Sequence, residues 1–108
     1  MSQALKIEAA TWQQMPDMPV EKWEAATLVI DEKLYILGGY GTGVRTSKIC
    51  HFFDPADGSW TQIQDLPSAI SHVNPVLDGR KIWFAGGFKD GYKDHVVAEV
   101  WNYDLDLD

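Results

Sequence analysis

Few side chains in this sequence have the types and spacing that chemistry requires. Its three histidines, His51, His72 and His95, include no pair at the i, i+4 spacing of a helical metal site. Its single cysteine, Cys50, can form neither an internal disulfide nor a cysteine-ligated zinc site. We therefore expect no metal and no cofactor, and we expect Cys50 to be a small buried side chain in a strand.

Three further patterns match reactive motifs only in part. The aspartates at alternate positions of 104–108 resemble the start of a calcium loop, but the central Gly and the distal Glu are missing. The glycines of segment 41–43 neither open a helix nor precede a Lys-Ser/Thr pair, as a phosphate loop requires. Ser71 and His72 are adjacent, and no nucleophile motif surrounds them. The sequence thus predicts no catalytic residue, and we expect that the protein is not an enzyme.

Two loops, residues 40–47 and 88–95, carry the most informative polar and aromatic groups. Function concentrates on loops that a rigid scaffold holds in place. Cationic and aromatic side chains together suit acidic partners or sugars. We therefore take the two loops as the candidate surface for a protein segment or a small sugar-like ligand. The candidate residues are Tyr40, Arg45, Tyr92, Lys93 and His95.

An internal repeat defines the elements that must hold these loops. Trp12 and Trp60 lie 48 residues apart, and the same offset relates the glycine pair 38–39 to the pair 86–87. Beyond the glycines the offset becomes 50, so the second loop is two residues longer than the first. The matched pairs are Trp12/Trp60, Asp17/Asp65, Pro19/Pro67, Lys33/Lys81, Gly38/Gly86, Gly39/Gly87 and, at the larger offset, Phe53/Tyr103 and Asp54/Asp104.

Short β-favouring segments recur within each repeat, and no segment has the period of a long amphipathic helix. Turn residues separate them, such as the Pro-Ala-Asp-Gly of 55–58 and the Asp-Gly of 78–79. The predicted strands of the first repeat are 25–30, 33–37, 49–53 and 60–63, and those of the second are 71–77, 81–85 and 96–103.

A period of about 50 residues with four strands per repeat is typical of kelch propeller blades. The doubled Gly-Gly, the Tyr/Phe-Asp before a turn and the Trp followed by Leu/Met-Pro each occur twice and in order. Because of these three repeated features, residues 12–108 resemble the kelch repeat family. The resemblance implies an all-β fold, a kelch-type β-propeller with two four-stranded blades per chain.

The resemblance implies structural roles for the landmark residues. The glycine pairs should allow close backbone approach and positive φ at the end of a strand. The aromatic residues should fill the space between neighbouring sheets. The inter-blade residues implied are Trp12, Gly38, Gly39, Phe53, Trp60, Gly86, Gly87 and Tyr103.

The first predicted strand of the sequence corresponds to the strand that the last predicted blade lacks. We expect an N-terminal extension at 1–11, an outer strand at 12–19, a blade at 24–66 and three strands of the next blade at 71–104. Strand 12–19 of one copy would then pair beside the strand 96–103 of another, and open strand edges invite such pairing. We expect a homo-oligomeric ring: three chains would give six blades, which we prefer, and four would give eight. The alternative is an excerpt of a longer kelch protein.

In a closed ring the inner strands line a central channel. Glu24 and His72 are equivalent by offset, and with Asn74 they are the candidate channel-lining residues. Some relatives of the family are enzymes, so the alternative function is an enzyme or lectin-like binder of a sugar or sugar acid in the channel. The copper-oxidase type fails here, because Cys50 lies in the middle of a strand.

Composition restricts the partners further. The formal net charge of −7 without a Lys/Arg cluster disfavours nucleic acid. No apolar run approaches the length of a membrane span, and residues 1–10 lack the pattern of a secretory signal. We therefore expect a cytoplasmic protein with no membrane partner.

Overall fold

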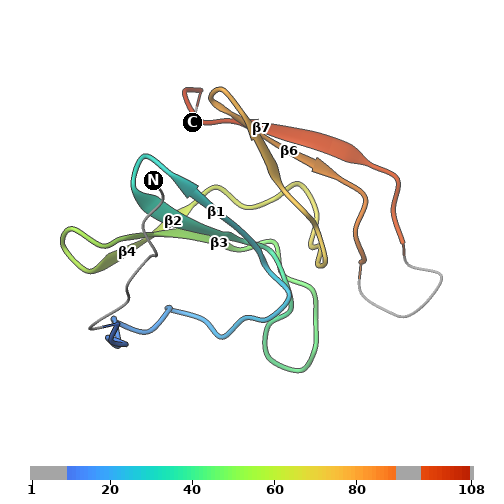
Figure 1. Ribbon diagram of the computed structural model, residues 1–108. Helices are drawn as coiled ribbons and strands as arrows, with labels where there is room; N and C mark the ends of the chain where they lie inside the picture. Colours follow the sequence, from blue (N-terminus) through green and yellow to red (C-terminus); the bar gives the residue numbers. More distant parts are fainter. Residues whose placement is uncertain (1–9, 90–95, 108) are drawn as a thin grey trace, which may run out of the picture.

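The fold consists of two antiparallel sheets. The computed structural model describes residues 10–89 and 96–107 of the chain (Figure 1). In each sheet the strand order follows the chain, and every neighbouring pair is antiparallel. The four-stranded sheet contains β1 (Ala26–Ile30), β2 (Lys33–Leu37), β3 (Cys50–Asp54) and β4 (Ser59–Ile63), and the three-stranded sheet contains β5 (Val76–Asp78), β6 (Lys81–Ala85) and β7 (Val100–Asp104). The described part contains no helix that is long and apolar enough to cross a membrane.

Turn chemistry explains why these hairpins form. Asp31 and Glu32 connect β1 to β2 and both have positive φ, 52° and 62°, as a two-residue hairpin turn with the twist of the strands requires. At the β3–β4 turn the Asp54 carboxylate accepts a hydrogen bond from the Ala56 amide at 2.9 Å, and Gly58 adopts φ 73°. Local residue choices therefore fix the strand connections.

The repeat seen in the sequence is also present in the hydrogen bonding. Trp23 bridges Tyr40 in the first sheet, and Ser71 bridges Phe88 at the equivalent place in the second. Each offset is 48 residues. On the other side of the loops, Tyr40 bridges Thr46 and Phe88 bridges Val96. This offset of 50 places the two extra residues of the second repeat within its loop, between Phe88 and Val96.

The glycine pairs end β2 and β6 with positive φ. A Cβ at Gly38 would lie 2.7 Å from the Ile70 carbonyl oxygen, and one at Gly39 would lie 2.8 Å from Ala25 Cα. The close neighbours are thus backbone atoms and aliphatic side chains. Glycine is required here because the loop that leads to the second sheet passes directly over Gly38, and the segment before β1 passes directly over Gly39.

The core lies between the two sheets. Its buried residues come from alternate positions of β1, β2 and β3 on one side and from β6 and the segment before β5 on the other. These residues are Ala26, Ile30, Tyr35, Leu37, Cys50, Ile70, Val73, Ile82 and Phe84. Cys50 is buried in a strand, as the sequence predicted. Cys50 packs within the core, and burial raises the pKa of its thiol.

Three predicted strands differ from the observed elements. The segment predicted at 71–77 is a strand only over Val76–Asp78, and that predicted at 96–103 is a strand over Val100–Asp104. Residues 12–19 form no strand in this single chain, and the Trp12 side chain is fully exposed. A strand needs a hydrogen-bonding neighbour, and the predicted neighbour of 12–19 belongs to another copy. The outer strand therefore stays a prediction.

Candidate functional site

A cluster of aromatic rings lies where the strands of both sheets meet the loops that follow the glycine pairs. The ring centroids of Trp23 and Tyr40 are 4.8 Å apart. The imidazole of His72 packs edge-on against Tyr40 at 5.5 Å and against Phe88 at 5.0 Å. Because Trp23 remains half exposed, the cluster presents an aromatic surface to solvent. We call Trp23, Glu24, Tyr40, His72 and Phe88 the strand-end cluster.

Backbone hydrogen bonds position this cluster. Trp23 and Tyr40 exchange two bonds of 3.0 and 2.8 Å, and Ser71 and Phe88 exchange two of 2.9 and 3.0 Å. Glu24 and His72 follow these bridges, and both have the left-handed φ that non-glycine residues rarely adopt, 52° and 59°. The same unusual conformation at equivalent positions shows that the repeat specifies the direction of these two side chains.

Polar contacts orient His72. Its Nδ1 lies 3.0 Å from Ser71 Oγ, and its Nε2 lies 3.6 Å from Glu24 Oε2. A backbone bond of 3.3 Å from the His72 amide to the Glu24 carbonyl links the two repeats at the same place. Ser71 is fully buried, so its hydroxyl fixes the imidazole and cannot act as an accessible nucleophile. The arrangement can bind a ligand but does not form a Ser-His-acid triad.

The structure unites two groups of residues that the sequence predicted separately. Tyr40 was a loop candidate, whereas Glu24 and His72 were channel candidates, and all three belong to the strand-end cluster. Asn74, the third channel candidate, is exposed and outside these contacts. Sequence reasoning missed Trp23 and Phe88 as site residues. The offset of 48 could have found them, because it pairs Trp23 with Ser71 and Tyr40 with Phe88.

Arg45 lies in a separate open groove beside the cluster. This groove, of about 500 Å³, runs between the loop after Gly39 and the loop that follows β4. Its basic residues are Arg45 and Lys48, no acidic residue lines it, and the hydroxyls of Thr42, Ser47 and Ser68 contribute hydrogen-bonding groups. The groove therefore has the chemistry to accept an anionic group. Tyr92, Lys93 and His95 lie outside the described residues.

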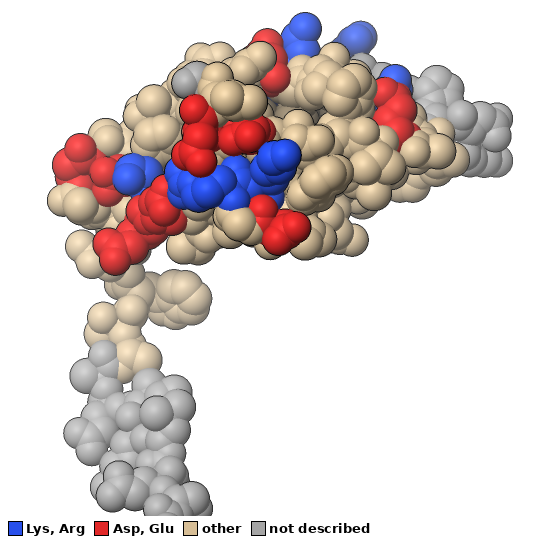
Figure 2. All heavy atoms as spheres, turned by 90° about the horizontal axis from the view of Figure 1, so that it is seen from above, with Lys and Arg blue, Asp and Glu red and all other residues tan. Residues whose placement is uncertain are grey.

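On the face shown in Figure 2, a row of Lys and Arg side chains is bordered by Asp and Glu. One ion-pair cluster joins the two sheets. Arg80, at the β5–β6 turn, contacts Asp31 at 2.8 Å and Asp106 at 3.2 Å. These contacts raise the pKa of the guanidinium, and they join the two hairpins at this end of the sheets. Among the described residues, no group of three or more His, Cys, Asp or Glu could hold a metal ion.

The second sheet exposes an apolar face. Val76, Trp83 and Val100 are 60%, 38% and 61% exposed, and Ala85 beside them is exposed as well. They belong to β5, β6 and β7, and the register pairs Val76 with Trp83 and Ala85 with Val100. This face, the outer apolar face, lies opposite the side of β6 from which Ile82 and Phe84 enter the core.

Comparison with known proteins agrees with this geometry. Residues 24–67 match the family described as Kelch motif. The chain is 28% identical over 80 residues to the Kelch domain-containing protein PF0436 of Pyrococcus furiosus, a match that covers 74% of this chain and 25% of that protein. It is 31% identical over 104 residues to the Kelch repeat and BTB domain-containing protein 2 of Ectromelia virus, covering 95% of this chain and 18% of that protein.

The fold of a solved structure matches as well. The structure titled "Structure of YjhT" superimposes with a TM-score of 0.70 at 20% identity, over 77% of this chain and 26% of that one. The chain thus spans about a quarter or less of the proteins that it matches here.

Proposed function

Because the chain is a kelch-repeat module of the β-propeller type, we propose that it serves as a two-blade building unit that completes a propeller by packing against further copies of itself. A propeller blade lies between two neighbouring blades, and in one chain each sheet has a neighbouring sheet on one face only. The preferred product is a ring of three chains and six blades, and four chains would give eight.

The outer apolar face carries this proposal. By the repeat offset, Val76, Trp83 and Val100 occupy the positions of Leu28, Tyr35 and Cys50 in the first sheet. Those three residues pack against the second sheet, where Tyr35 and Cys50 are buried. In the first sheet these positions contact the next sheet along the chain. In the second sheet the equivalent positions are exposed to solvent.

Burial of this face would stabilise an assembly substantially. Each Å² of apolar surface removed from water contributes roughly 25 cal/mol. A contact between the head of one unit and the tail of the next closes into a ring when the rotation per unit permits it. Identical two-blade units can build six or eight blades but not seven, and a propeller embedded in a longer protein would use the same face within one chain.

The experiment is a measurement of solution mass by light scattering over a range of concentrations. We expect a discrete oligomer, with three chains as the preferred number. Val100→Glu should dissociate it, because the carboxylate would lie within the buried face. The matched control is Val44→Glu, an equally exposed valine in the loop after Gly39. A wild-type chain that remains a compact, cooperatively unfolding monomer at high concentration contradicts the proposal.

The strand-end cluster supports a second candidate function, binding of a sugar or sugar acid. An exposed tryptophan packed at a tilt against a tyrosine offers an apolar platform for a sugar ring, and Glu24 and His72 offer hydrogen-bonding groups beside it. The neighbouring groove with Arg45 and Lys48 suits a carboxylate. Calorimetric titration with neutral and acidic sugars tests this. Trp23→Ala should abolish binding, Arg45→Ala should affect acidic sugars only, and no heat with any sugar refutes it.

A further inference from the structure

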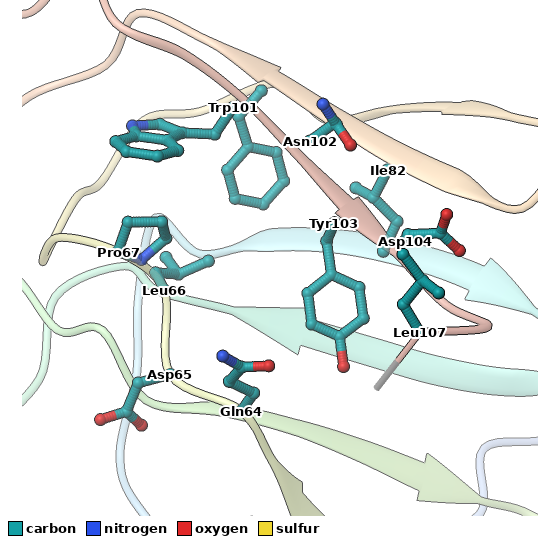
Figure 3. Close-up of a pocket in the computed structure, with 11 residues that line it drawn as sticks. Gln64, Asp65, Leu66, Pro67, Ile82, Trp101, Asn102, Tyr103, Asp104 and Leu107 are labelled. Carbon is teal, nitrogen blue, oxygen red and sulfur yellow. The ribbon is translucent and has the colours of Figure 1, made fainter.

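A pocket of about 330 Å³ lies between the segment that follows β4 and the strands β6 and β7. Figure 3 shows the side chain of Tyr103 extending toward Gln64 across this space, with Trp101 above Pro67 and Leu66 at its other end. Its walls are mainly apolar and continue the core between the sheets, because Ile82 and Phe84 belong to both. The lining residues are Gln64, Asp65, Leu66, Pro67, Ile82, Phe84, Trp101, Asn102, Tyr103, Asp104 and Leu107.

The first sheet shows what belongs in such a pocket. There the indole of Trp60, from β4, packs against Phe53 with ring centroids 4.9 Å apart and edge-on against His51 at 6.4 Å. Its Nε1–H donates a hydrogen bond of 2.9 Å to the carbonyl oxygen of Pro16. Trp60 thus joins the third strand of its own sheet to the segment that leads into that sheet.

The pocket is the counterpart of the Trp60 site one repeat later. At the offset of 50, His51 and Phe53 correspond to Trp101 and Tyr103, which line the pocket. At the offset of 48, Pro16 corresponds to Gln64, which lines it from the opposite side. All three groups that contact Trp60 therefore recur around the pocket.

The residue that corresponds to Trp60 at this offset is Trp12. Its side chain is fully exposed. The Trp12 segment is tied at Pro16 to Trp60, which packs on Phe53 and His51. Phe53 and His51 alternate along β3 with Cys50 and Phe52, which pack toward the second sheet, so they lie on the face of the first sheet away from the pocket. The exposed indole of Trp12 and the pocket that matches it lie on opposite faces of the first sheet. Trp12 of one copy is therefore better placed to enter the pocket of a second copy than its own.

We infer that the indole of Trp12 from a second copy inserts into this pocket, between Trp101 and Tyr103 on one side and Gln64 on the other. The Nε1–H of Trp12 donates to the backbone carbonyl of Gln64, as that of Trp60 donates to Pro16. Residues 12–19 of the inserting copy then lie along the outer edge of β7. This inference rests on the proposed assembly and identifies its anchoring contact.

A complementation experiment tests the contact between copies. Trp12→Ala removes the inserting side chain, and Trp101→Glu places a charge in the pocket. Each variant alone should be monomeric, with circular dichroism confirming that it folds. An equimolar mixture should form a one-to-one heterodimer, since Trp12 of the Trp101→Glu chain can enter the intact pocket of the Trp12→Ala chain. A Trp12→Ala chain that still assembles like the wild type overturns the inference and leaves the proposed assembly standing.

A peptide experiment examines the pocket independently of the ring. A fluorescein-labelled peptide of residues 10–20 should bind the Trp12→Ala chain, as measured by anisotropy. Replacing its tryptophan with alanine should weaken binding by at least about tenfold, as for a central aromatic anchor. Naphthylalanine keeps the rings but lacks the N–H, and should weaken binding by about fivefold. Equal binding of all three peptides refutes the inference. If the wild-type chain is monomeric yet its Trp12→Ala variant binds the tryptophan peptide selectively, the pocket assignment stands and the ring fails.

Discussion

The two sheets arise from the same repeat, yet their burial differs strand by strand. Along β2 the three residues Tyr35–Leu37 are all buried, whereas along β6 only the alternate residues Ile82 and Phe84 are buried. The first sheet has cover on both faces, from the second sheet on one side and from Trp60 with the Pro16 segment on the other. The second sheet has cover on one face. Burial in this fold is therefore decided by the segments that pack on each face of a sheet and not by the repeat sequence alone.

The largest effect should come from the covered face of the second sheet. Phe84→Ala should lower the free energy of unfolding by about 3–5 kcal/mol, because it leaves a cavity in the core between the sheets. Trp83→Ala, one residue earlier on the exposed face, should cost under about 1 kcal/mol in the monomer. Urea unfolding at low protein concentration measures both. Equal losses would contradict the one-sided packing of this sheet.

The glycine pairs offer a second comparison. A Cβ at Gly38 would lie 2.7 Å from the Ile70 carbonyl oxygen, whereas one at Gly86 would approach its nearest neighbour, the Val97 carbonyl oxygen, only to 3.4 Å. Both positions have positive φ, which costs an alanine about 1 kcal/mol. We expect Gly38→Ala to cost about 2–3 kcal/mol and Gly86→Ala about 1 kcal/mol. Thermal unfolding of the two variants measures this, and a larger loss at Gly86 would refute the argument from crowding.

A smaller effect should follow acidification. Burial, with the charge of Lys22 second, lowers the pKa of His51 below its usual 6.5. The unfolded chain then binds more protons than the folded chain between the two pKa values, so stability should fall as the pH drops from 6.5 through the folded pKa. His51→Phe, which brings this position closer to its aromatic equivalent Trp101, should remove that loss in urea titrations from pH 7.5 to 5. His72→Asn is the control and should retain it.

The smallest effect should come from the ion pairs between the hairpins. Arg80→Ala removes the contacts with Asp31 and Asp106, and all three side chains are largely exposed. Surface pairs contribute little and are screened by salt. We expect a slight loss of thermal stability at low ionic strength that disappears at 1 M NaCl. A loss that persists in high salt would show that Arg80 acts through packing of its stem.

Sequence reasoning recovered much of the fold but only part of the strand-end cluster. The glycine pairs, the turn residues and the offset of 48 identified the two repeats and the approximate position of every observed strand. The contact between Glu24 and His72 could not be foreseen from residue types alone, because their left-handed backbone directs both side chains. Trp23 carried no motif, and its ring contact with Tyr40 identified it in the structure.

The sequence by itself determined the repeat, the strands and the glycine turns, because these follow from local backbone preferences and from residue spacing. The tertiary structure decided which face of each sheet is buried. It also placed in the second repeat a pocket that corresponds to the site of Trp60 in the first. Such features depend on which surfaces approach each other in space, and a one-dimensional pattern assigns the same residue types to a covered and an uncovered blade alike.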